Sequence, residues 1–459
     1  MDTQHLIDMD RAHWIHPVSV WRKQEKQGVT ILRSAKGAYI TDIDGHTLLD
    51  GFSGLWCVNL GYGHESIVRA ATEQMQRLPY ATGYFNYGSE PAIELAAKLA
   101  QLAPGDLDHV FFTMGGSDAI DTTVRLICYY FNTIGKPEKK QFISLQRGYH
   151  GSSAIGSGLT ALSAFHRNFD VPLPTQHTIS SPYPYRNPIG PDPATIIAAS
   201  VQELRSKVAE IGAKRVAAFF CEPVQGSGGV IVPPKGWLAA MRQACAELDI
   251  LFVADEVITG FGRTGPLFAC ESENVTPDFM TVAKGLTSGY SPMGAVFISD
   301  RIYRAIADAN PTDMPVGHGL TYSGHPVSAA VGLEALRLYR EGGMLENGQK
   351  VGAYFEQRLQ ELSRHPLVGD VRSCGMLAAV ELVTDKVRKT KPDKALKIGE
   401  RLGQAGYRNR LIFRAFSDDI IGFAPPLCCT TSDIDLLIER FQQSLDEIVN
   451  IDEILRVVN

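Results

Sequence analysis

Two apolar runs, each followed by a charged residue, restrict the fold of this chain more than any other feature. Residues 250–254 (ILFVA) lead to Asp255, and residues 279–283 (FMTVA) lead to Lys284. Short runs that are apolar throughout are typical of strands buried on both faces of a parallel sheet. The carboxyl ends of such strands meet at one edge, where ligands bind. We therefore expect an α/β protein with Asp255 and Lys284 in one crevice.

Lys284 is costly to bury, because the loss of hydration disfavours the ammonium form. The same cost lowers the pKa of the side chain and makes a neutral amine available for a Schiff base. Alternatively, the side chain reaches solvent from the strand end. Asp255 favours the first interpretation. A carboxylate opposite a Schiff-base lysine is the pairing that pyridoxal phosphate requires, because it keeps the pyridine nitrogen protonated.

Three motifs resemble those of class III (omega) aminotransferases, which are fold-type I pyridoxal-phosphate enzymes. They are VADEVITGFGRTG (253–265), AKGLTSGYSPMGAV (283–296) and TYSGHP (321–326), and the likeness extends from about Gly54 to Leu427. The resemblance implies a large, mostly parallel sheet domain flanked by helices and a smaller α+β domain. The expected division is an N-terminal segment (1–60) that joins the small domain, a cofactor-binding domain (61–326) and a small domain (327–459).

Composition excludes several other classes of protein. The 459 residues carry a net charge of −6 without a block of lysine and arginine, which argues against nucleic acid and anionic membranes as partners. No apolar run is long enough to span a membrane, and the N-terminus lacks a secretory signal. Eight cysteines without a C-x-x-C pair suggest reduced thiols and a cytoplasmic protein. The histidines lack metal-binding spacing, so we expect no metal.

Other elements follow from hydrophobic periodicity. Helical spacing predicts helices, short apolar runs predict strands, and an Asp-Gly pair predicts a hairpin over 37–50. Residues 165–195 are rich in proline and are expected to be irregular. The predicted helices are 65–78, 90–102, 199–211, 329–339, 347–362 and 394–405, and the further predicted strands are 109–113, 141–145, 216–221 and 375–382.

A candidate phosphate site follows the predicted strand 109–113. Gly115, Gly116 and Ser117 stand where this strand turns into a helix. Unpaired N–H groups and the helix dipole bind anions at such a position, and the serine hydroxyl adds a donor. A glycine pair is also common in ordinary turns, but its place in a chain with the Asp255 and Lys284 pair indicates the cofactor phosphate.

Four further residues are assigned to the cofactor. The resemblance implies that Tyr149 stacks beside the cofactor ring and that Val257 covers the opposite face. It also implies that Glu222, which follows the strand 216–221, contacts the surroundings of the cofactor and does no acid–base work. His150 is either a core histidine or a residue of the site, and we include it among the cofactor-binding candidates.

The resemblance supplies most of the substrate-binding candidates. It places Trp56 at the border of the substrate site, although a tryptophan commonly packs in a core. Tyr84 and Phe85, in an aromatic loop, either pack or wall the substrate pocket, and that pocket can be the partner subunit's. Thr321 either caps a helix or reaches the cofactor phosphate of the other subunit. The second option implies a homodimer with shared active sites.

Arg414 interrupts the apolar run 411–413, where a guanidinium needs an anion. That anion is either Asp418 or Asp419 nearby, or the carboxylate of a substrate. The resemblance assigns the second role, because the pocket must bind an amine donor and then a keto acid. A long arginine can turn toward the carboxylate for one half-reaction and away for the other.

The predicted function is a pyridoxal-phosphate-dependent transaminase with a ping-pong mechanism and Lys284 as the Schiff-base lysine and proton carrier. The donor is an omega-amino acid, a diamine or another primary amine, and the acceptor is a keto acid, most commonly pyruvate in this family. Mutases and racemases share the fold and are alternatives, as is a cofactor-binding protein without catalysis. A nicotinamide dehydrogenase is disfavoured, because no G-x-G-x-x-G follows an early strand.

Overall fold

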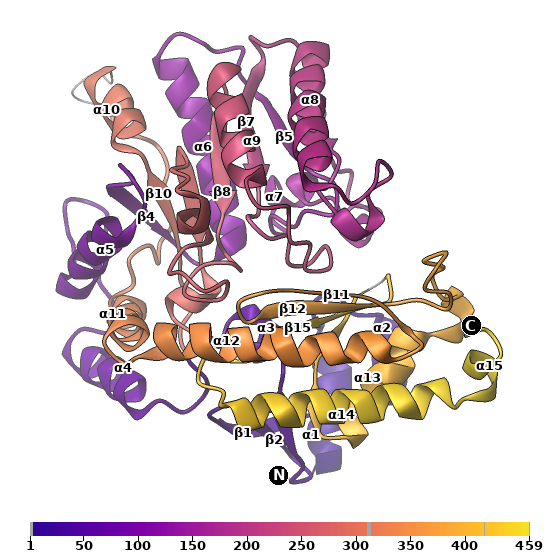
Figure 1. Ribbon diagram of the computed structural model, residues 1–459. Helices are drawn as coiled ribbons and strands as arrows, with labels where there is room; N and C mark the ends of the chain where they lie inside the picture. The colour runs from indigo at the N-terminus through magenta and orange to yellow at the C-terminus, as the bar shows by residue number, and fades with distance from the viewer. Residues whose placement is uncertain (1–2, 310–313, 417, 459) are drawn as a thin grey trace.

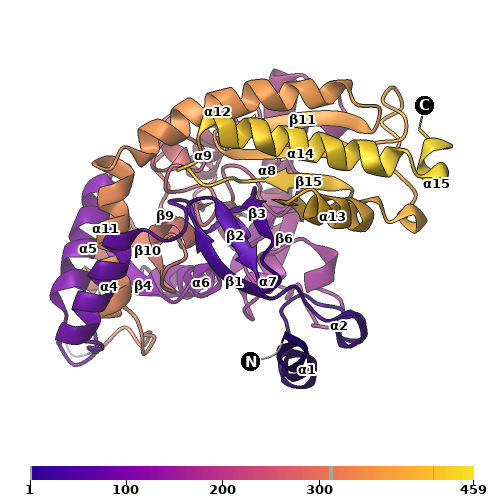
Figure 2. The same cartoon turned by 90° about the horizontal axis from the view of Figure 1, so that it is seen from below.

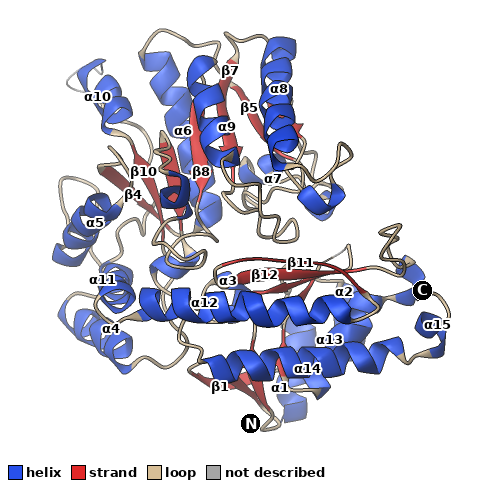
Figure 3. Cartoon of the chain, in the orientation of Figure 1, coloured by secondary structure: helices blue, strands red, loops and turns tan. Residues whose placement is uncertain are grey.

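The computed structural model describes residues 3–309, 314–416 and 418–458, which form two parts (Figure 1). The upper part in this view contains one large sheet between helices, and the lower part contains two small sheets and several long helices. Figure 3 shows helices on both sides of the strands of the upper part. The predicted α/β fold, with a large, mostly parallel sheet and a smaller α+β part, is confirmed.

The large sheet has seven strands, among which β10 alone runs antiparallel to its neighbours. In spatial order they are β4 (His109–Thr113), β10 (Gly294–Ile298), β9 (Phe279–Val282), β8 (Leu251–Asp255), β7 (Val216–Cys221), β5 (Gln141–Leu145) and β6 (Gln176–Ile179). The two strands that carry the predicted catalytic pair, β8 and β9, are therefore adjacent and parallel.

Side chains of the central strands alternate between two apolar clusters, one on each face of the sheet. Phe220 and Val253 belong to one cluster, and Phe219 and Phe252 belong to the other. This alternation follows from the two-residue period of a strand, and it explains why both strands are apolar throughout. The helices of the first face are α6 (Gly116–Thr133), α7 (Gly156–Leu159) and α10 (Asp300–Ala309), and those of the second are α8 (Pro193–Ile211) and α9 (Trp237–Glu247).

The lower part is built around an antiparallel sheet in the order β11-β12-β15-β14. Phe355, Phe423 and Phe441 join this sheet to two long helices that lie side by side in Figures 1 and 2. The elements are β11 (Val368–Cys374), β12 (Leu377–Leu382), β14 (Arg414–Ala415), β15 (Ile420–Phe423), α12 (Met344–Gln360), α13 (Ile398–Arg408), α14 (Thr431–Val449) and α15 (Asp452–Leu455).

The N-terminal residues add a second small sheet to this lower part. Its order is β1-β2-β3-β13, and Leu411 of β13 pairs with Leu49 of β3. This pairing agrees with an N-terminal segment that joins the small domain, although the limits at residues 60 and 326 remain a prediction. The elements are α1 (Thr3–His13), α2 (Trp21–Gln27), β1 (Leu32–Lys36), β2 (Tyr39–Asp42), β3 (Thr47–Asp50) and β13 (Leu411–Ile412).

Three helices, α4 (Glu65–Arg77), α5 (Glu90–Leu102) and α11 (Pro326–Arg340), pack together beside the two parts. Figures 1 and 2 both show α4, α5 and α11 as neighbours at the left of the molecule. A Cβ atom at Gly332 of α11 would lie 2.9 Å from a methyl group of Leu95 on α5. The glycine therefore allows the two helices to approach closely.

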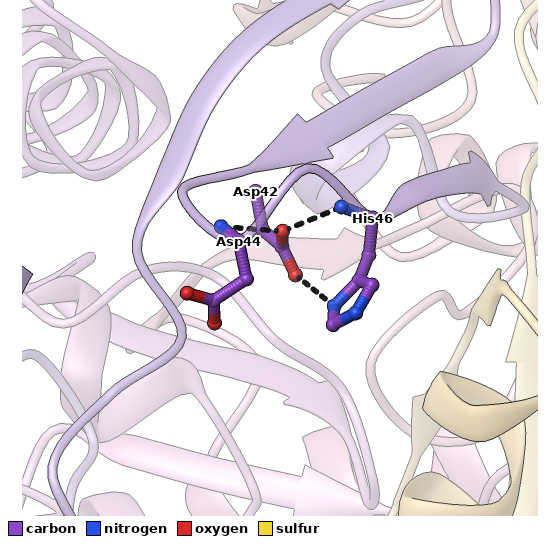
Figure 4. A group of neighbouring side chains, drawn as sticks. All are labelled: Asp42, Asp44 and His46. Atoms are coloured by element: carbon purple, nitrogen blue, oxygen red, sulfur yellow. Dashed lines mark hydrogen bonds and ion pairs between the residues drawn. The ribbon is translucent and has the colours of Figure 1, made fainter.

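The predicted hairpin at 37–50 is present, and its turn explains a cluster of possible metal ligands. Ligand atoms of Asp42, Asp44 and His46 lie within 4.8 Å of one another (Figure 4). However, Asp42 Oδ1 accepts the backbone N–H groups of Asp44 (3.0 Å) and His46 (2.8 Å). Its Oδ2 accepts the Tyr407 hydroxyl and lies 3.0 Å from His46 Nδ1. The carboxylate thus closes the turn with these bonds.

The structure differs from the predicted elements at three places. Residues 165–195 contain β6, an edge strand of the large sheet, as well as the start of α8 at Pro193. The strand predicted at 375–382 is β12, and its hairpin partner β11 was not predicted. The helix predicted at 394–405 is a single 3-10 turn at Lys394–Leu396 followed by α13.

Candidate active site

A cavity of about 300 Å³ lies at the carboxyl ends of β7, β8 and β9, beside the N-terminus of α6. This is the edge of the sheet at which an α/β protein binds its ligand. Nine of the residues predicted from the sequence line the cavity: Gly115, Gly116, Ser117, Tyr149, His150, Glu222, Asp255, Val257 and Lys284.

Lys284 begins a single 3-10 turn, two residues after the end of β9. Its φ is 40°, a conformation that is strained for a residue other than glycine and that clusters at functional sites. Burial lowers the pKa of Lys284, and the nearby Asp255 acts in the opposite direction. The position therefore makes a neutral amine easier to obtain, as a covalent lysine requires.

Asp255, the last residue of β8, has 4% of its surface exposed and three hydrogen-bond partners. Its Oδ1 accepts the backbone N–H of Val257 (3.1 Å) and the Thr281 hydroxyl (3.2 Å). Its Oδ2 lies 2.8 Å from Nδ1 of His150. These contacts fix the direction of the carboxylate.

His150 is buried beside Asp255, and its ring meets that of Phe220 on β7 edge-on, with the ring centres 6.2 Å apart. Burial favours the neutral ring, but the hydrogen bond and the charge of Asp255 outweigh burial and raise the pKa of His150. Its Nε2 is buried without a partner among the described residues. The structure thus brings His150 to the lining of the cavity and into contact with Asp255, and its role toward a cofactor remains a prediction.

Glu222 directly follows β7 and is also buried. Its carboxylate accepts the backbone N–H of Tyr149 (2.9 Å) and that of Gly226 (2.8 Å). Burial raises the pKa of Glu222 to about 7, although the neighbouring His150 acts to lower it. The side chain thus holds the loop of Tyr149, whose ring packs edge-on against Phe165 at 5.2 Å.

The N-terminus of α6 faces the same cavity, with Gly115 as its N-cap. No side chain of the described residues caps this helix, so its first N–H groups are free to bind an anion. A Cβ atom at Gly116 would lie 3.0 Å from a methyl group of Val257. Because Gly116 has no side chain, Val257 can lie close to the start of α6.

Trp56 lies beside the lysine, with the centre of its ring 5.4 Å from Lys284 Nζ. It is 3% exposed and packs against Phe52 (4.5 Å) and Phe416 (5.8 Å). The residue is outside the set that lines the cavity, and its indole N–H has no partner in the described part of the chain. An aromatic wall with one free donor suits the border of a small-molecule site.

Tyr84, Phe85 and Thr321 do not reach the cavity of their own chain. Tyr84 and Phe85 are 42% and 82% exposed. Thr321 is exposed, and its backbone carbonyl accepts the hydroxyl of Tyr80 at 2.9 Å. This exposure is compatible with the expected role of all three in a partner's site, a role that remains a prediction.

Arg414 is exposed on β14, and its guanidinium makes no hydrogen bond or ion pair with any residue of the described ranges. Neighbouring atoms remove part of the hydration of the guanidinium, and this desolvation lowers the pKa of Arg414. The alternative partner Asp418 instead pairs with Arg147 at 2.7 Å, and Asp419 makes no pair with Arg414. The guanidinium is therefore free for another anion.

Sequence reasoning missed several residues that line the cavity and follow Lys284 in the chain. They are Thr287, Gly289, Ser291, Pro292 and Met293. All five lie within the motif at 283–296, so their proximity to Lys284 in the chain was the available signal. Met114, Gly151, Ile258 and Ala283 complete the lining.

None of the helices in the described residues has the length and apolar character needed to cross a membrane.

Comparison with known proteins identifies the family. The family model for class III aminotransferases matches residues 20–445. A putrescine–pyruvate aminotransferase from Pseudomonas aeruginosa is 43% identical over 449 residues, which cover 97% of this chain and 96% of that protein.

Two further relatives agree. A diaminobutyrate–2-oxoglutarate transaminase from Halomonas elongata is 37% identical over 452 residues and covers 97% of this chain and 96% of its own. The crystal structure of an (S)-enantioselective omega-transaminase from Thermomicrobium roseum superposes with a TM-score of 0.95 at 39% identity, covering 98% of this chain and all (100%) of that one. The protein therefore belongs to the class III aminotransferases, and its fold is that of the omega-transaminases.

Proposed function

We propose that this aminotransferase moves the amino group of a diamine, an omega-amino acid or another primary amine to a keto acid, with pyruvate as the favoured acceptor. The observation that carries this proposal is that Lys284 and Asp255 line one cavity at the ends of adjacent parallel strands. The names of the relatives, which include a putrescine and a diaminobutyrate enzyme, support an amine donor with two polar ends.

The residues of the cavity fit pyridoxal phosphate. The uncapped start of α6 suits a phosphate, Asp255 suits a protonated ring nitrogen, and Lys284 suits a covalent bond to an aldehyde. When bound, pyridoxal phosphate supplies that aldehyde and a ring that takes up electrons from the substrate carbon.

Each residue then has a separate role. With the cofactor bound, the Lys284 amine would hold it covalently, and the same amine, once freed by the donor amine, would carry a proton between two carbon atoms in each of two successive half-reactions. Asp255, supported by His150, holds a proton at the ring nitrogen. Tyr149 and Val257 enclose the ring, and Glu222 holds the Tyr149 loop.

Arg414 and Trp56 are proposed to bind the substrate. Arg414 has no anion of its own among the described residues, so it is available for the carboxylate of the keto acid. Trp56 forms an apolar wall beside Lys284 that suits the carbon chain of a donor. Different side chains would thus bind a donor that lacks a carboxylate and an acceptor that has one.

We also propose a cytoplasmic homodimer in which Thr321, Tyr84 and Phe85 complete the partner's site. An exposed aromatic loop beside an exposed threonine supports this proposal, because large exposed apolar groups mark interfaces. All eight cysteines are free, which is consistent with a reducing compartment.

The function is tested with a panel of amine donors, pyruvate as acceptor and alanine formation as the readout. A transaminase makes alanine only when donor and acceptor are both present, whereas a mutase or racemase makes none. Lys284→Ala is expected to abolish alanine formation. It should also abolish the covalent attachment of the cofactor to the protein by borohydride. The matched control is Lys139→Ala, which removes another buried lysine that hydrogen-bonds the carbonyl of Val216 (3.1 Å). Covalent fixation that persists in Lys284→Ala would contradict the assignment.

A further inference from the structure

Arg263 is fully buried, with 0% of its surface exposed, and no carboxylate of the described chain pairs with it. Burial lowers the pKa of Arg263 to about 10. A buried guanidinium without an ion pair is costly, so its hydrogen bonds must compensate. Arg263 lies in the segment that follows Asp255, the last residue of β8, but it does not line the cavity.

The guanidinium joins three distant stretches of the chain. Nη1 donates to the carbonyls of Pro425 (2.6 Å) and Met376 (3.3 Å), which belong to the C-terminal part. Nη2 donates to Oδ1 of Asn59 (2.8 Å) and to the hydroxyl of Ser53 (3.1 Å), which belong to the N-terminal segment. The planar fork of an arginine is needed to reach all four acceptors at once.

Ser53 starts the loop that carries Trp56, and this loop is strained. Positive φ angles occur at Ser53 (49°), Gly54 (66°) and Trp56 (57°). Such angles are costly for serine and tryptophan and persist only when the surroundings enforce them. The Ser53 hydroxyl donates to the Ala424 carbonyl (2.6 Å) while it accepts Arg263, and Asp50 accepts the N–H of Gly54 (2.7 Å).

Asn59 connects Arg263 to the lysine. Its Nδ2 donates to the carbonyl of Phe261 (3.0 Å). A Cβ atom at Gly285 would lie 2.7 Å from the same Nδ2. The amide of Asn59 therefore packs directly against the backbone of the residue that follows Lys284, and Arg263 fixes the other end of that amide.

We infer that Arg263 is a positioning residue for the reaction, acting through Asn59 on the Lys284 turn and through Ser53 on the strained loop of Trp56. This inference rests on the proposed function, because it assigns Arg263 to a site that uses Lys284. Both half-reactions use the same lysine. Arg263 therefore affects them equally, whereas Arg414 affects the keto-acid half alone.

The test compares Arg263→Lys with Arg242→Lys by single-turnover measurements of each half-reaction. The lysine keeps the charge but loses the fork, so both rates are expected to fall by about tenfold to a hundredfold. Arg242 bonds the Thr276 carbonyl (2.8 Å) and Asp278 (3.3 Å) at the opposite ends of the strands. Its variant should keep both rates within about twofold of the wild type.

Hydrogen exchange of the cofactor-free protein supplies a readout that does not depend on activity. In Arg263→Lys, residues 50–62 and 284–289 should exchange faster, while β7 and β8 should exchange as in the wild type. Faster exchange throughout the chain, or rates of both half-reactions within about twofold of the wild type, would overturn the inference. Failure of the proposed function would instead appear as an inactive wild-type protein in the donor panel.

Asn59→Ala and Ser53→Ala keep the inference testable if the arginine variant does not fold. Asn59→Ala should slow both half-reactions as well. Where Arg263→Lys does fold, the Arg263→Lys/Asn59→Ala double variant should lose less activity than the product of the two single losses, because Arg263 acts through Asn59. A fully multiplicative loss in that double variant, or wild-type rates in both Asn59→Ala and Ser53→Ala, would overturn the inference.

Discussion

The Asp255 carboxylate has two separate tasks. Its oxygens form hydrogen bonds with three residues from different segments, which orient the group, and its negative charge would hold a proton on the cofactor ring. An asparagine can keep the bonds of Oδ1 to Val257 and Thr281, but it is neutral and cannot hold a proton on a pyridine nitrogen. We therefore predict that Asp255→Asn folds and binds pyridoxal phosphate but loses most of its turnover. Measurement of bound cofactor and of steady-state alanine formation checks this.

The matched control for that variant is Asp278→Asn. Asp278 is equally buried (4% exposed) and pairs with Arg301 (2.8 Å) at the other end of the sheet. This control should lower thermal stability without a specific loss of rate, because the neutral amide removes the charge with which Arg301 and Arg242 pair. An Asp255→Asn enzyme with the turnover of the wild type would refute the role of the carboxylate.

Arg414 allows a prediction that separates the two substrates. In Arg414→Ala the Michaelis constant for pyruvate should rise by the equivalent of about 1.5–3 kcal/mol, the usual contribution of a hydrogen bond to a charged group. The half-reaction with a donor that has no carboxylate should change little. Single-turnover absorbance measurements of each half-reaction check this difference. Arg408→Ala, which removes a surface partner of Glu447, serves as the control. Equal losses in both halves would indicate a structural role for Arg414.

The position of Arg414 in the sequence could not reveal which anion it serves. Asp418 and Asp419 are close in the chain and were plausible partners, but Asp418 is paired with Arg147, which comes from the loop after β5. By contrast, Lys284 and Asp255 were predictable, because each follows an apolar run that must be buried. Charge at the end of a buried strand is a local signal, whereas the choice among surface partners depends on distant segments.

At the scale of single elements, the turn from β4 into α6 gives the next prediction. Gly116→Ala places a methyl group 3.0 Å from Val257. The Val257 side chain must then move away by a few tenths of an ångström to relieve the close contact. The variant should fold but bind pyridoxal phosphate several-fold more weakly, by about 1 kcal/mol. Equilibrium dialysis of the cofactor checks this. Gly403→Ala, in α13 with nothing within 4 Å of the new methyl group, should leave the affinity unchanged. Equal affinities in both variants would exclude a tight cradle at Gly116.

The elements that the sequence predicted best are those whose pattern comes from burial on both faces. The strands β5 and β7 begin and end where the apolar runs predict them. The strand β6 was missed because three of its four residues, QHTI, are polar, only the first and the last are buried, and the strand lies at the sheet edge within a proline-rich stretch. The strand β11, VGDVRSC, was missed because most of its residues are only partly buried, so its sequence carries charges.

At the scale of the whole molecule, the loop at residues 80–87 carries several exposed aromatic side chains. Tyr80, Tyr84, Phe85 and Tyr87 are each at least 40% exposed, and the ring of Tyr80 lies 6.0 Å from that of the exposed Tyr322. Thr321 lies beside this group through its bond to Tyr80. A surface of this kind is expected to be covered, and a second copy of the chain related by two-fold symmetry is the simplest partner.

Subunit exchange tests whether the covered face also completes the active site. Lys284→Ala and Thr321→Ala should each have little activity as separate homodimers. In a mixed dimer, one site lacks both native groups, and the other, which takes Lys284 from one subunit and Thr321 from its partner, lacks neither. Random exchange at equal concentrations should therefore restore about a quarter of the wild-type activity, because half of the dimers carry one intact site of two. Mixing Lys284→Ala with Asp255→Asn is the control, since both groups come from the same chain and no site becomes complete. No recovery in the first mixture, despite demonstrated exchange, would show that Thr321 serves its own subunit or no site at all. Recovery in the control would show that Lys284 and Asp255 of one site do not come from the same chain.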